Sequence, residues 1–229
     1  MTSRSGAPAP LTPRERHRLR TREEILEAAL AVMTTHGVAA LNLTEVARRV
    51  GLRQPSLYQY FSSRTAVYDA LFERGMLEHL DAVAAAIDAA PSGWAAVRAA
   101  LTATLRFSAD HPVLAQFLFT RAVPGFTPSE QAYAPSLRQH DLVRAEVAAA
   151  VTAGELHPAA ASERGVALLV AITAGVAAQQ GASDPGRGVG DERFTPLLGP
   201  ALDMYAAYFS QDRPVGWTPW PRSPDPRSC

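Results

Sequence analysis

The 229-residue sequence predicts an all-α fold made of two helical parts. Apolar residues recur every three or four positions through most of the chain, which is the spacing of a helix face. Nowhere do they alternate with the period of two that is typical of a strand. Capping residues, glycines and prolines divide the apolar stripes into segments of helical length. With 47% hydrophobic and 19% charged residues, the composition is that of a globular protein.

The first expected helix has a clear start and a clear end. Thr12 is a capping residue, Pro13 suits the first helical position, and Glu15 completes a capping box. Gly37 follows the last apolar residues and would supply a left-handed C-terminal cap. The small and proline-rich residues 1–11 are expected to be a disordered arm. Between cap and stop lies an apolar stripe, which comprises Leu19, Ile25, Leu26, Ala29, Leu30 and Met33.

Three more helices are expected before residue 91. Asn42 caps the second, which is short because Val50-Gly51 stops it about two turns later. The third begins at Leu52–Pro55 and is expected to run to Phe61. Ser62-Ser63 caps a long fourth helix, whose apolar side comprises Val67, Ala70, Leu71, Leu77, Leu80, Ala84 and Ile87.

The rest of the chain is rich in alanine, and its helices are expected at about 93–109, 112–121, 129–153, 159–182 and 191–210. Gly181–Gly190 is expected to be a loop, and residues 211–229 a proline-rich tail. The longest nearly uncharged stretch, Val166–Ala178, is too short to cross a bilayer and is expected to be a buried helix. No long apolar run lies near the N-terminus, so we expect no signal peptide, no membrane partner and a cytoplasmic location.

Charge is distributed unevenly, although the net charge is zero. Residues 1–64 hold ten arginines and five glutamates, and the remainder holds twelve arginines and seventeen acidic residues. The chain has no lysine. A basic front half and an acidic back half indicate two tasks, the first of them with a polyanion.

A helix-turn-helix is predicted where the second and third helices meet. Such a motif needs a small residue where the helices cross, a glycine in the turn, and an apolar residue facing back from the second helix. Ala47, Gly51 and Leu57 meet these needs at spacings of four and six, the spacings of a DNA-binding helix-turn-helix. The residues that complete this small core are Val46, Val50 and Leu52. The alternative is an ordinary helical hairpin whose polar face is merely solvated.

The outward face of the third helix carries hydrogen-bonding side chains rather than the acidic mixture of an ordinary solvated face. Gln54 suits bidentate pairing with adenine, and Pro55 offers an apolar surface to a thymine methyl. Thr44 and Arg64 are placed for phosphates, together with the N–H groups where the second and fourth helices begin. The full set of expected DNA-binding residues is Thr44, Arg53, Gln54, Pro55, Ser56, Tyr58, Gln59, Tyr60 and Arg64.

The run L-N-L-T-E-V-A-R-R-V-G-L-R-Q-P-S-L-Y-Q-Y-F-S-S-R (41–64), after a first helix that ends in His-Gly, resembles the TetR family of regulators. The resemblance is strong over residues 14–75, and Gln54–Tyr58 is very similar to the recognition helix of the founding member. It implies base contacts by Gln54 and Pro55 and a phosphate contact by Tyr58. The chain departs from the family's usual serine at Arg53 and from its usual lysine at Arg64. Arg64 keeps the phosphate role, whereas Arg53 adds a DNA contact or is simply exposed.

The segments F-L-F-T-R-A-V-P-G-F-T-P-S (117–129), A-A-Q-Q (177–180) and A-L-D-M-Y (201–205) resemble the branch of the family with tetracycline-repressor-like C-terminal domains. That resemblance implies a pocket for an unidentified small-molecule effector above the fourth helix. An apolar cavity with few polar anchors is the usual ligand site. The alternative to a pocket role is that these residues belong to the core, that Arg121 pairs with a carboxylate, and that His111 is a cap or hinge residue. The candidates are Trp94, Phe107, His111, Phe117, Phe119, Arg121, Phe126, Tyr133, His140 and Gln179.

The family resemblance also implies a homodimer built on the last two helices. Small residues let helices approach closely in an intersubunit four-helix bundle. The alternative is that these faces serve only their own core. Two recognition helices about 34–36 Å apart are needed to read successive major grooves of a palindrome. The expected interface residues are Ala167, Ala171, Gly175, Ala178, Leu198, Leu202 and Tyr205.

Two other functions compete with that of a ligand-responsive regulator. An enzyme is disfavoured because the sequence has no nucleophile elbow, zinc-protease motif, Cys–His pairing or P-loop. We expect no metal and no cofactor, since the six histidines lack ligand spacing and the single cysteine is Cys229. A DNA-binding protein without a ligand stays open. The expected organisation is a disordered arm (1–11), a helix-turn-helix DNA-binding domain (12–62), a helical regulatory and dimerisation domain (63–210) and a proline-rich tail (211–229). The predicted function is that of a repressor, released from a palindromic operator by a small molecule.

Overall fold

The computed structural model describes residues 11–183 and 193–212, and all regular structure in these residues is helical. The all-α prediction is confirmed. The predicted arm and tail, and most of the predicted Gly181–Gly190 loop, lie outside the described residues; Gly181 itself is helical. The elements are α1 (Pro13–His36), η1 (Val38–Ala40), α2 (Leu43–Arg49), α3 (Gln54–Leu57), α4 (Arg64–Asp88), α5 (Trp94–Asp110), α6 (Pro112–Phe119), α7 (Glu130–Thr152), η2 (Pro158–Ala161), α8 (Glu163–Ser183), η3 (Thr195–Leu197) and α9 (Leu198–Tyr208).

The predicted helix starts are present in the structure. The Thr12 hydroxyl accepts the N–H of Glu15, whose carboxylate accepts the N–H of Thr12 at 2.7 Å, so the capping box is complete. Ser63 caps α4 by accepting the N–H of Ala66 at 3.0 Å. Gly37 has the positive φ of +93° that favours glycine, but its ψ of 155° lies outside the left-handed helical region that we predicted.

Three helix extents differ from the prediction. Helix α3 ends at Leu57 rather than Phe61, because the amides of Gln59 and Tyr60 bond three residues back and tighten the chain into a turn. The predicted helix 159–182 is interrupted at Ser162, which separates η2 from α8. The predicted helix 191–210 has regular helix only from Thr195, and α9 itself spans 198–208.

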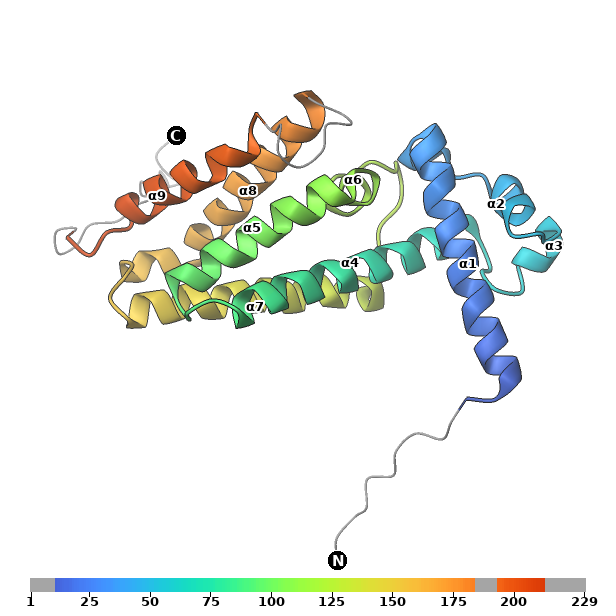
Figure 1. The fold of residues 1–229 in the computed structure, drawn as a ribbon, viewed down its shortest axis with the longest axis horizontal. Coiled ribbons are helices and arrows are strands. Elements are labelled where there is room, and N and C mark those ends of the chain that lie inside the picture. The colour runs from blue at the N-terminus through green and yellow to red at the C-terminus, as the bar shows by residue number, and fades with distance from the viewer. Residues whose placement is uncertain (1–10, 184–192, 213–229) are drawn as a thin grey trace, which may run out of the picture.

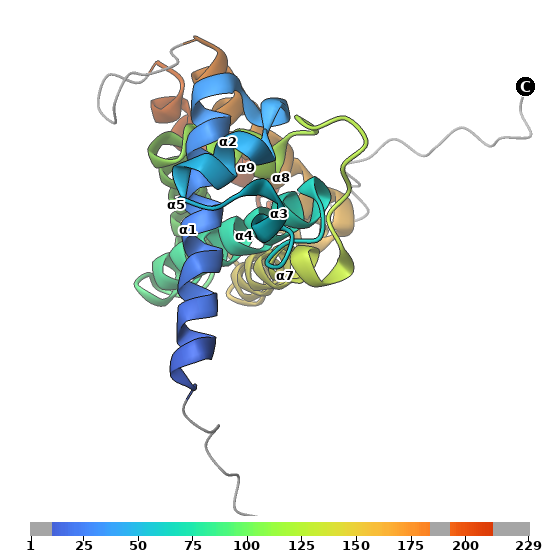
Figure 2. The ribbon, with the colours of Figure 1, turned by 90° about the vertical axis from the view of Figure 1, so that its right-hand side faces the viewer.

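Helices α1, α2 and α3 form one end of an elongated molecule, and α4 leads from that end into the helical body (Figure 1). Within the body α4 packs against α5 and α7, and α8 packs against α5 and α9. Figure 2 looks onto the end that carries α2 and α3, and there the N-terminal half of α1 continues past them.

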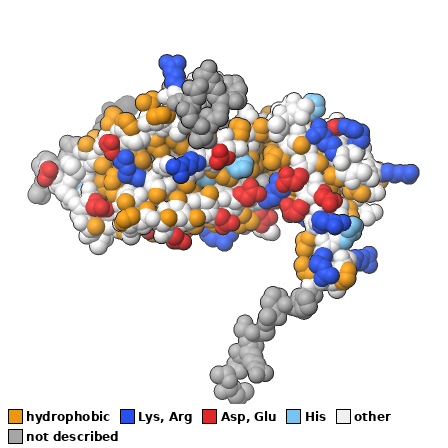
Figure 3. All heavy atoms as spheres, in the orientation of Figure 1, with side chains coloured by type: hydrophobic (Ala, Val, Ile, Leu, Met, Phe, Trp, Pro, Cys, Tyr) orange, Lys and Arg blue, Asp and Glu red, His pale blue; other side chains and the backbone are white. Residues whose placement is uncertain are grey.

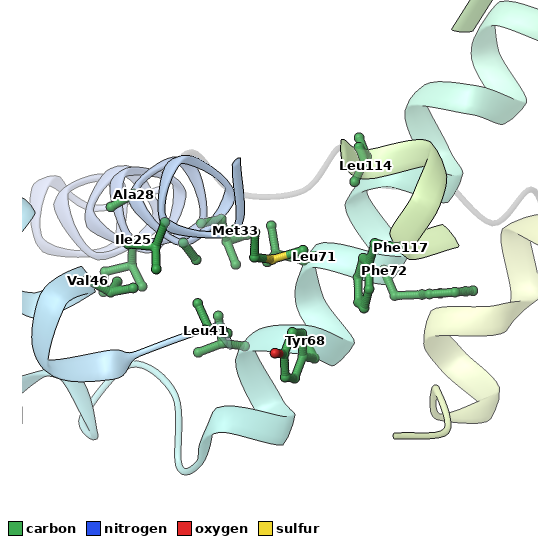
Figure 4. Packing of buried hydrophobic residues seen from close by; sticks show 14 of the residues in the cluster. Ile25, Ala28, Met33, Leu41, Val46, Tyr68, Leu71, Phe72, Leu114 and Phe117 are labelled. Carbon is green, nitrogen blue, oxygen red and sulfur yellow. The ribbon is translucent and has the colours of Figure 1, made fainter. Parts of the chain in front are cut away.

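One buried cluster runs from the helix-turn-helix into the body. It includes Ile25 of α1 and Val46 of α2, continues through Leu71 and Phe72 of α4, and reaches Phe117 of α6 (Figure 4). The separation of domains between residues 62 and 63 stays a prediction, and the packing is continuous across it. A second cluster joins α5, the C-terminal part of α7, α8 and α9.

Two residues of the predicted apolar stripes are exposed. Leu19 is 50% exposed and lies on the part of α1 where residues 11–20 are all exposed. Leu77 faces solvent on α4, whereas His79 on the same helix is only 1% exposed. The sequence pattern alone therefore assigned Leu77 to the wrong side.

Helix α8 is more exposed than predicted. Its 21 residues have a mean hydropathy of 1.5 over 18 residues, so by length and composition it could cross a membrane. Only 22% of that window is buried within the subunit. The expectation of a buried helix too short to span is therefore corrected: one face of α8 packs on the core and the other is exposed.

Candidate nucleic-acid interface

Three buried residues hold α2 and α3 together. Ala47, Leu57 and Val46 are essentially inaccessible to solvent, as the helix-turn-helix prediction requires. Gly51 takes a φ of +70° in the turn, where a side chain would be strained. The N–H of Leu52 then bonds to the carbonyl of Ala47 at 2.9 Å and closes the turn.

Predicted DNA-binding residues of α3 and α4 converge at one open hollow. Gln54 and Tyr58 line it from residues 54–60, here called the recognition segment, which comprise α3 and the turn after it. Arg64 lines it from the first turn of α4. Asn42 also lines it, and its side chain accepts the N–H groups of Thr44 and Glu45, which caps α2. The arrangement gathers amide, phenol and guanidinium groups on one side of the molecule.

Thr44 orients the amide of Gln54. The Thr44 hydroxyl lies 3.0 Å from Gln54 Oε1 and donates to it. The Nε2 group of Gln54 is thereby left to donate elsewhere, and Oε1 keeps a second lone pair. Such an amide can still offer the donor and acceptor pair that adenine requires in the major groove.

The other predicted DNA-binding residues differ in their exposure to solvent. Arg53, Pro55 and Gln59 are exposed, and Ser56 is half-buried. Arg53 occupies the N-cap position of α3 without capping it through its side chain, so its two alternatives stay open. Tyr60 is corrected: it is half-buried against the first core cluster rather than fully on the outward face.

Two arginines of α1 support the recognition segment, and the sequence reasoning missed them. The guanidinium of Arg22 donates to the carbonyl of Tyr60 at 2.5 Å and lies 4.2 Å above the ring of Phe61. Arg18 reaches the carbonyl of Gln59 at 3.5 Å. Their spacing of four residues was the available signal, but their target could be known only from the fold.

The charge at the end of α2 is internally balanced. Glu45 accepts hydrogen bonds from Arg48 at 2.8 Å and from Arg49 at 2.9 Å. The bond from Arg48, followed by that from Arg49, lowers the pKa of Glu45 to about 2. These two arginines therefore add less to the field of the interface than their number suggests.

The predicted effector-pocket residues separate into groups. Phe117, Phe126 and Tyr133 contact Phe72, and the rings of Phe117 and Phe126 stack at 5.6 Å. Trp94 lies in the second core, stacked on Tyr205 at 5.5 Å. The other exposed candidates are His111, Phe119, Arg121, His140 and Gln179.

Arg121 borders an open hollow between the two halves of the molecule. His36 and the residues of η1 form one side of it, and Gln116, Thr120 and Arg121 at the end of α6 form the other. Arg121 is exposed rather than partly buried, which corrects its role as an anchor inside an apolar site.

His79 of α4 is one of three buried polar residues among the described residues, with Thr21 and Thr173. Its ring lies 5.0 Å from the rings of Phe107 and Phe119, and Phe107 in turn lies 5.0 Å from His111. Nε2 of His79 lies 3.0 Å from the hydroxyl of Thr104. Nδ1 has no partner among the described residues. Burial lowers the pKa of His79 to about 4, so the ring is neutral at neutral pH. The histidine itself was not among the predicted pocket residues.

The predicted dimer-interface residues fall into an exposed group and a buried group. Ala167, Ala171, Gly175 and Ala178 are exposed along one face of α8. The interface assignment is corrected for three residues that are buried in their own subunit's core, namely Leu198, Leu202 and Tyr205. Large apolar residues are also exposed on α8, η3 and α9, among them Val170 (49%), Leu197 (50%) and Met204 (73%); Leu197 and Met204 were not among the predicted interface residues.

The described residues thus form a helix-turn-helix with a buried core and a polar hollow, placed at the end of a helical body. This arrangement is typical of helix-turn-helix DNA-binding proteins. Residues 25–71 match the family described as bacterial regulatory proteins, tetR family. Over these residues the chain is similar to the tetR family of bacterial regulatory proteins.

Individual proteins are similar to this chain over different lengths. The tetracycline repressor protein class D of Escherichia coli is 32% identical over 60 residues, which are 26% of this chain and 28% of that protein. The chain thus matches less than a third of that relative's length. A solved structure from Rhodococcus sp. RHA1, of a protein with unknown function, is 26% identical with a TM-score of 0.68 and covers 83% of this chain and 95% of its own. A TetR family transcription regulator from Marinobacter aquaeolei VT8 shares the fold, with 19% identity, a TM-score of 0.63, and coverage of 84% and 97%.

Proposed function

We propose that the protein is a transcriptional repressor that binds a palindromic operator as a homodimer and is released by a small-molecule effector. The observation that carries DNA binding is the hollow where Gln54, Tyr58 and Arg64 converge, with Thr44 orienting the Gln54 amide. Gln54 and Pro55 read bases, and Tyr58, Thr44 and Arg64 bind phosphates.

The exposed apolar surface of α8 and α9 supports the homodimer. Small residues of α8 are exposed, as are Val170, Leu197 and Met204 on α8, η3 and α9, which pack on one another. Exposed apolar surface of this kind is typical of an interface. A second copy that packs on this face would cover the half of α8 that the subunit leaves exposed. It would also supply the second recognition helix that a palindrome requires.

The environment of His79 supports a site for the effector. A neutral imidazole that is only 1% exposed, with Nδ1 unpartnered and aromatic rings on two sides, suits an apolar molecule with one hydrogen-bonding group. The effector acts only through its differential affinity for two conformations of the protein. A DNA-binding protein without an effector is the alternative, because many of the predicted pocket rings contact one another.

Selection of bound sequences from a random DNA pool tests the DNA-reading proposal. Gln54→Ala should reduce discrimination at one base pair by roughly 1–3 kcal/mol, whereas Arg64→Ala should weaken all sequences alike. Gln116→Ala, an exposed glutamine on α6, is the matched control and should leave the selected sequence unchanged. If Gln54→Ala selected the wild-type sequence with undiminished preference, the proposed register of the recognition helix would be wrong.

Loss of binding to the selected DNA on addition of small molecules tests the regulatory part. A screen in which no compound class weakens DNA binding would favour the DNA-binding protein without an effector. Analytical ultracentrifugation tests the dimer. Met204→Glu should shift the protein toward monomers, because a charge would be buried at the centre of the apolar face.

A further inference from the structure

The N-terminal part of α1 carries positive charge at a place where a helix disfavours it. Arg14 and Arg16 lie in the first turns of α1, near the positive end of the helix dipole. All residues from 11 to 20 are exposed, so the arginines do not stabilise a buried contact there. Glu15, the acidic residue of the first turn, is engaged by Thr12. Helix stability therefore does not account for this charge.

The arginines of this segment lie on two different faces. With 3.6 residues per turn, Arg14, Arg18 and Arg22 share one face, and Arg16 and Arg20 lie about 200° away from Arg14 and Arg18. Arg20 pairs with Glu24 at 3.4 Å. On that same side, further along the helix, Glu23 and Glu27 pair with Arg74 of α4.

The face of Arg14, Arg18 and Arg22 is continuous with the recognition segment. Arg22 and Arg18 reach the carbonyls of Tyr60 and Gln59, the last residues before the chain turns toward α4. Arg14 lies one further turn along the same line. Among the described residues, no ion pair joins Arg14 or Arg18 to a carboxylate.

The views of the molecule agree with this continuity. The N-terminal half of α1 projects past α2 and α3 on the end that carries them (Figures 1 and 2). Basic side chains lie along that half of α1 and at the edge of α2 and α3, whereas acidic side chains gather where α1 meets α4 (Figure 3).

We propose that Arg14 and Arg18 form a second phosphate-binding site, which holds the DNA backbone flanking the major groove that α3 reads. The inference rests on the proposed DNA binding and extends the contact surface beyond the helix-turn-helix. Guanidinium groups suit phosphate oxygens, and such contacts position the protein without reading sequence. Each one also releases condensed counterions from the duplex, which makes binding more dependent on salt.

Salt dependence of binding to a duplex of random sequence, about 30 base pairs or three helical turns long, tests the site. Each phosphate contact that is lost lowers the slope of log affinity against log salt by about 0.9, which is about 3.5-fold in the affinity ratio between 50 and 200 mM salt. The double variant Arg14→Ala/Arg18→Ala should lower the slope by about 1.8 per subunit. Arg14→Ala alone should lower it by half as much, and Arg14 does not touch the recognition segment.

Arg16→Ala/Arg20→Ala is the matched control, since it removes the same charge from the opposite face of the same helix. The slope depends on the number of phosphates neutralised by direct contact, so this control should change it less than Arg14→Ala/Arg18→Ala does. Equal slopes for both double variants would overturn the inference while leaving DNA binding intact. A wild-type protein that binds neither random nor selected DNA would overturn the proposed function as well. Thermal unfolding by circular dichroism confirms that each variant is folded.

Discussion

Protonation of His79 is expected to destabilise the fold as the pH falls. The Thr104 hydroxyl donates its one proton to the carbonyl of Ala100 at 3.1 Å, so it must accept from Nε2–H of His79. Nδ1 is then the unprotonated nitrogen, and it has no partner among the described residues. An added proton on Nδ1 would create a buried charge without an acceptor. The lowered pKa of about 4, caused by burial, expresses that cost.

The size of the effect follows from linkage. The pKa of His79 is about 4 in the folded state and 6.5 in the reference state. Each pKa unit corresponds to 1.36 kcal/mol, so the neutral state of His79 contributes about 3 kcal/mol to the free energy of unfolding. Because the folded pKa is depressed, this stability is fully present above pH 6.5 and is lost progressively as the pH falls to about 4.

Urea unfolding of the wild type and of His79→Gln between about pH 7.5 and pH 4 measures the effect, because glutamine can keep a hydrogen bond but does not titrate. Carboxylates that titrate in the same range affect both proteins equally. The difference in the free energy of unfolding between wild type and variant should therefore shift by about 3 kcal/mol against the wild type across this range. A difference that stays constant would refute the assignment of a depressed pKa to this histidine.

Two further substitutions test the packing that positions the interface. Leu57→Ala should lower the free energy of unfolding by about 2–5 kcal/mol and weaken DNA binding, whereas the exposed Leu137→Ala should change urea unfolding by less than about 0.5 kcal/mol. Gly165→Ala should destabilise the protein by more than about 1 kcal/mol in the same assay, since its Cβ would overlap the carbonyl oxygen of Ala160. Gly199→Ala, whose Cβ would meet its nearest neighbour at 3.9 Å, should not lower stability; a similar loss in both glycine variants would contradict the steric argument.

The features that sequence reasoning predicted well are local ones. The capping box of Thr12, the cap of Asn42 and the turn glycine Gly51 each depend on residues within three or four positions. The helix-turn-helix core around Ala47 and Leu57 combines a few such signals at fixed spacing, so both the motif and its place in the chain could be predicted.

The features that sequence reasoning missed depend on residues far apart in the chain. The apolar stripe of α4 does not show that His79 is buried and Leu77 exposed. The histidine is buried by residues of α5 and α6 that pack against α4. Likewise, Leu202 and Tyr205 form a good apolar face for a partner subunit, but α5 and α8 of the same subunit cover it. The interface candidates that remain exposed are the small residues of α8, which hydrophobicity alone would rank lower.

Helix α4 is where the two halves of the molecule are mechanically joined. On one side, Arg74 pairs with Glu27 of α1 at 2.7 Å. On the other, Asp69 accepts the N–H and the hydroxyl of Ser129, the cap of α7, at 2.7 Å each. Between these polar contacts, α4 contributes Leu71 to the same buried cluster as α1, α2 and α6. Close-packed interiors transmit displacement rather than absorbing it. A shift of α7 or α6 would therefore move α4 together with α1, and with them the recognition segment that Arg18 and Arg22 hold, which is the mechanical link that regulation from the body requires.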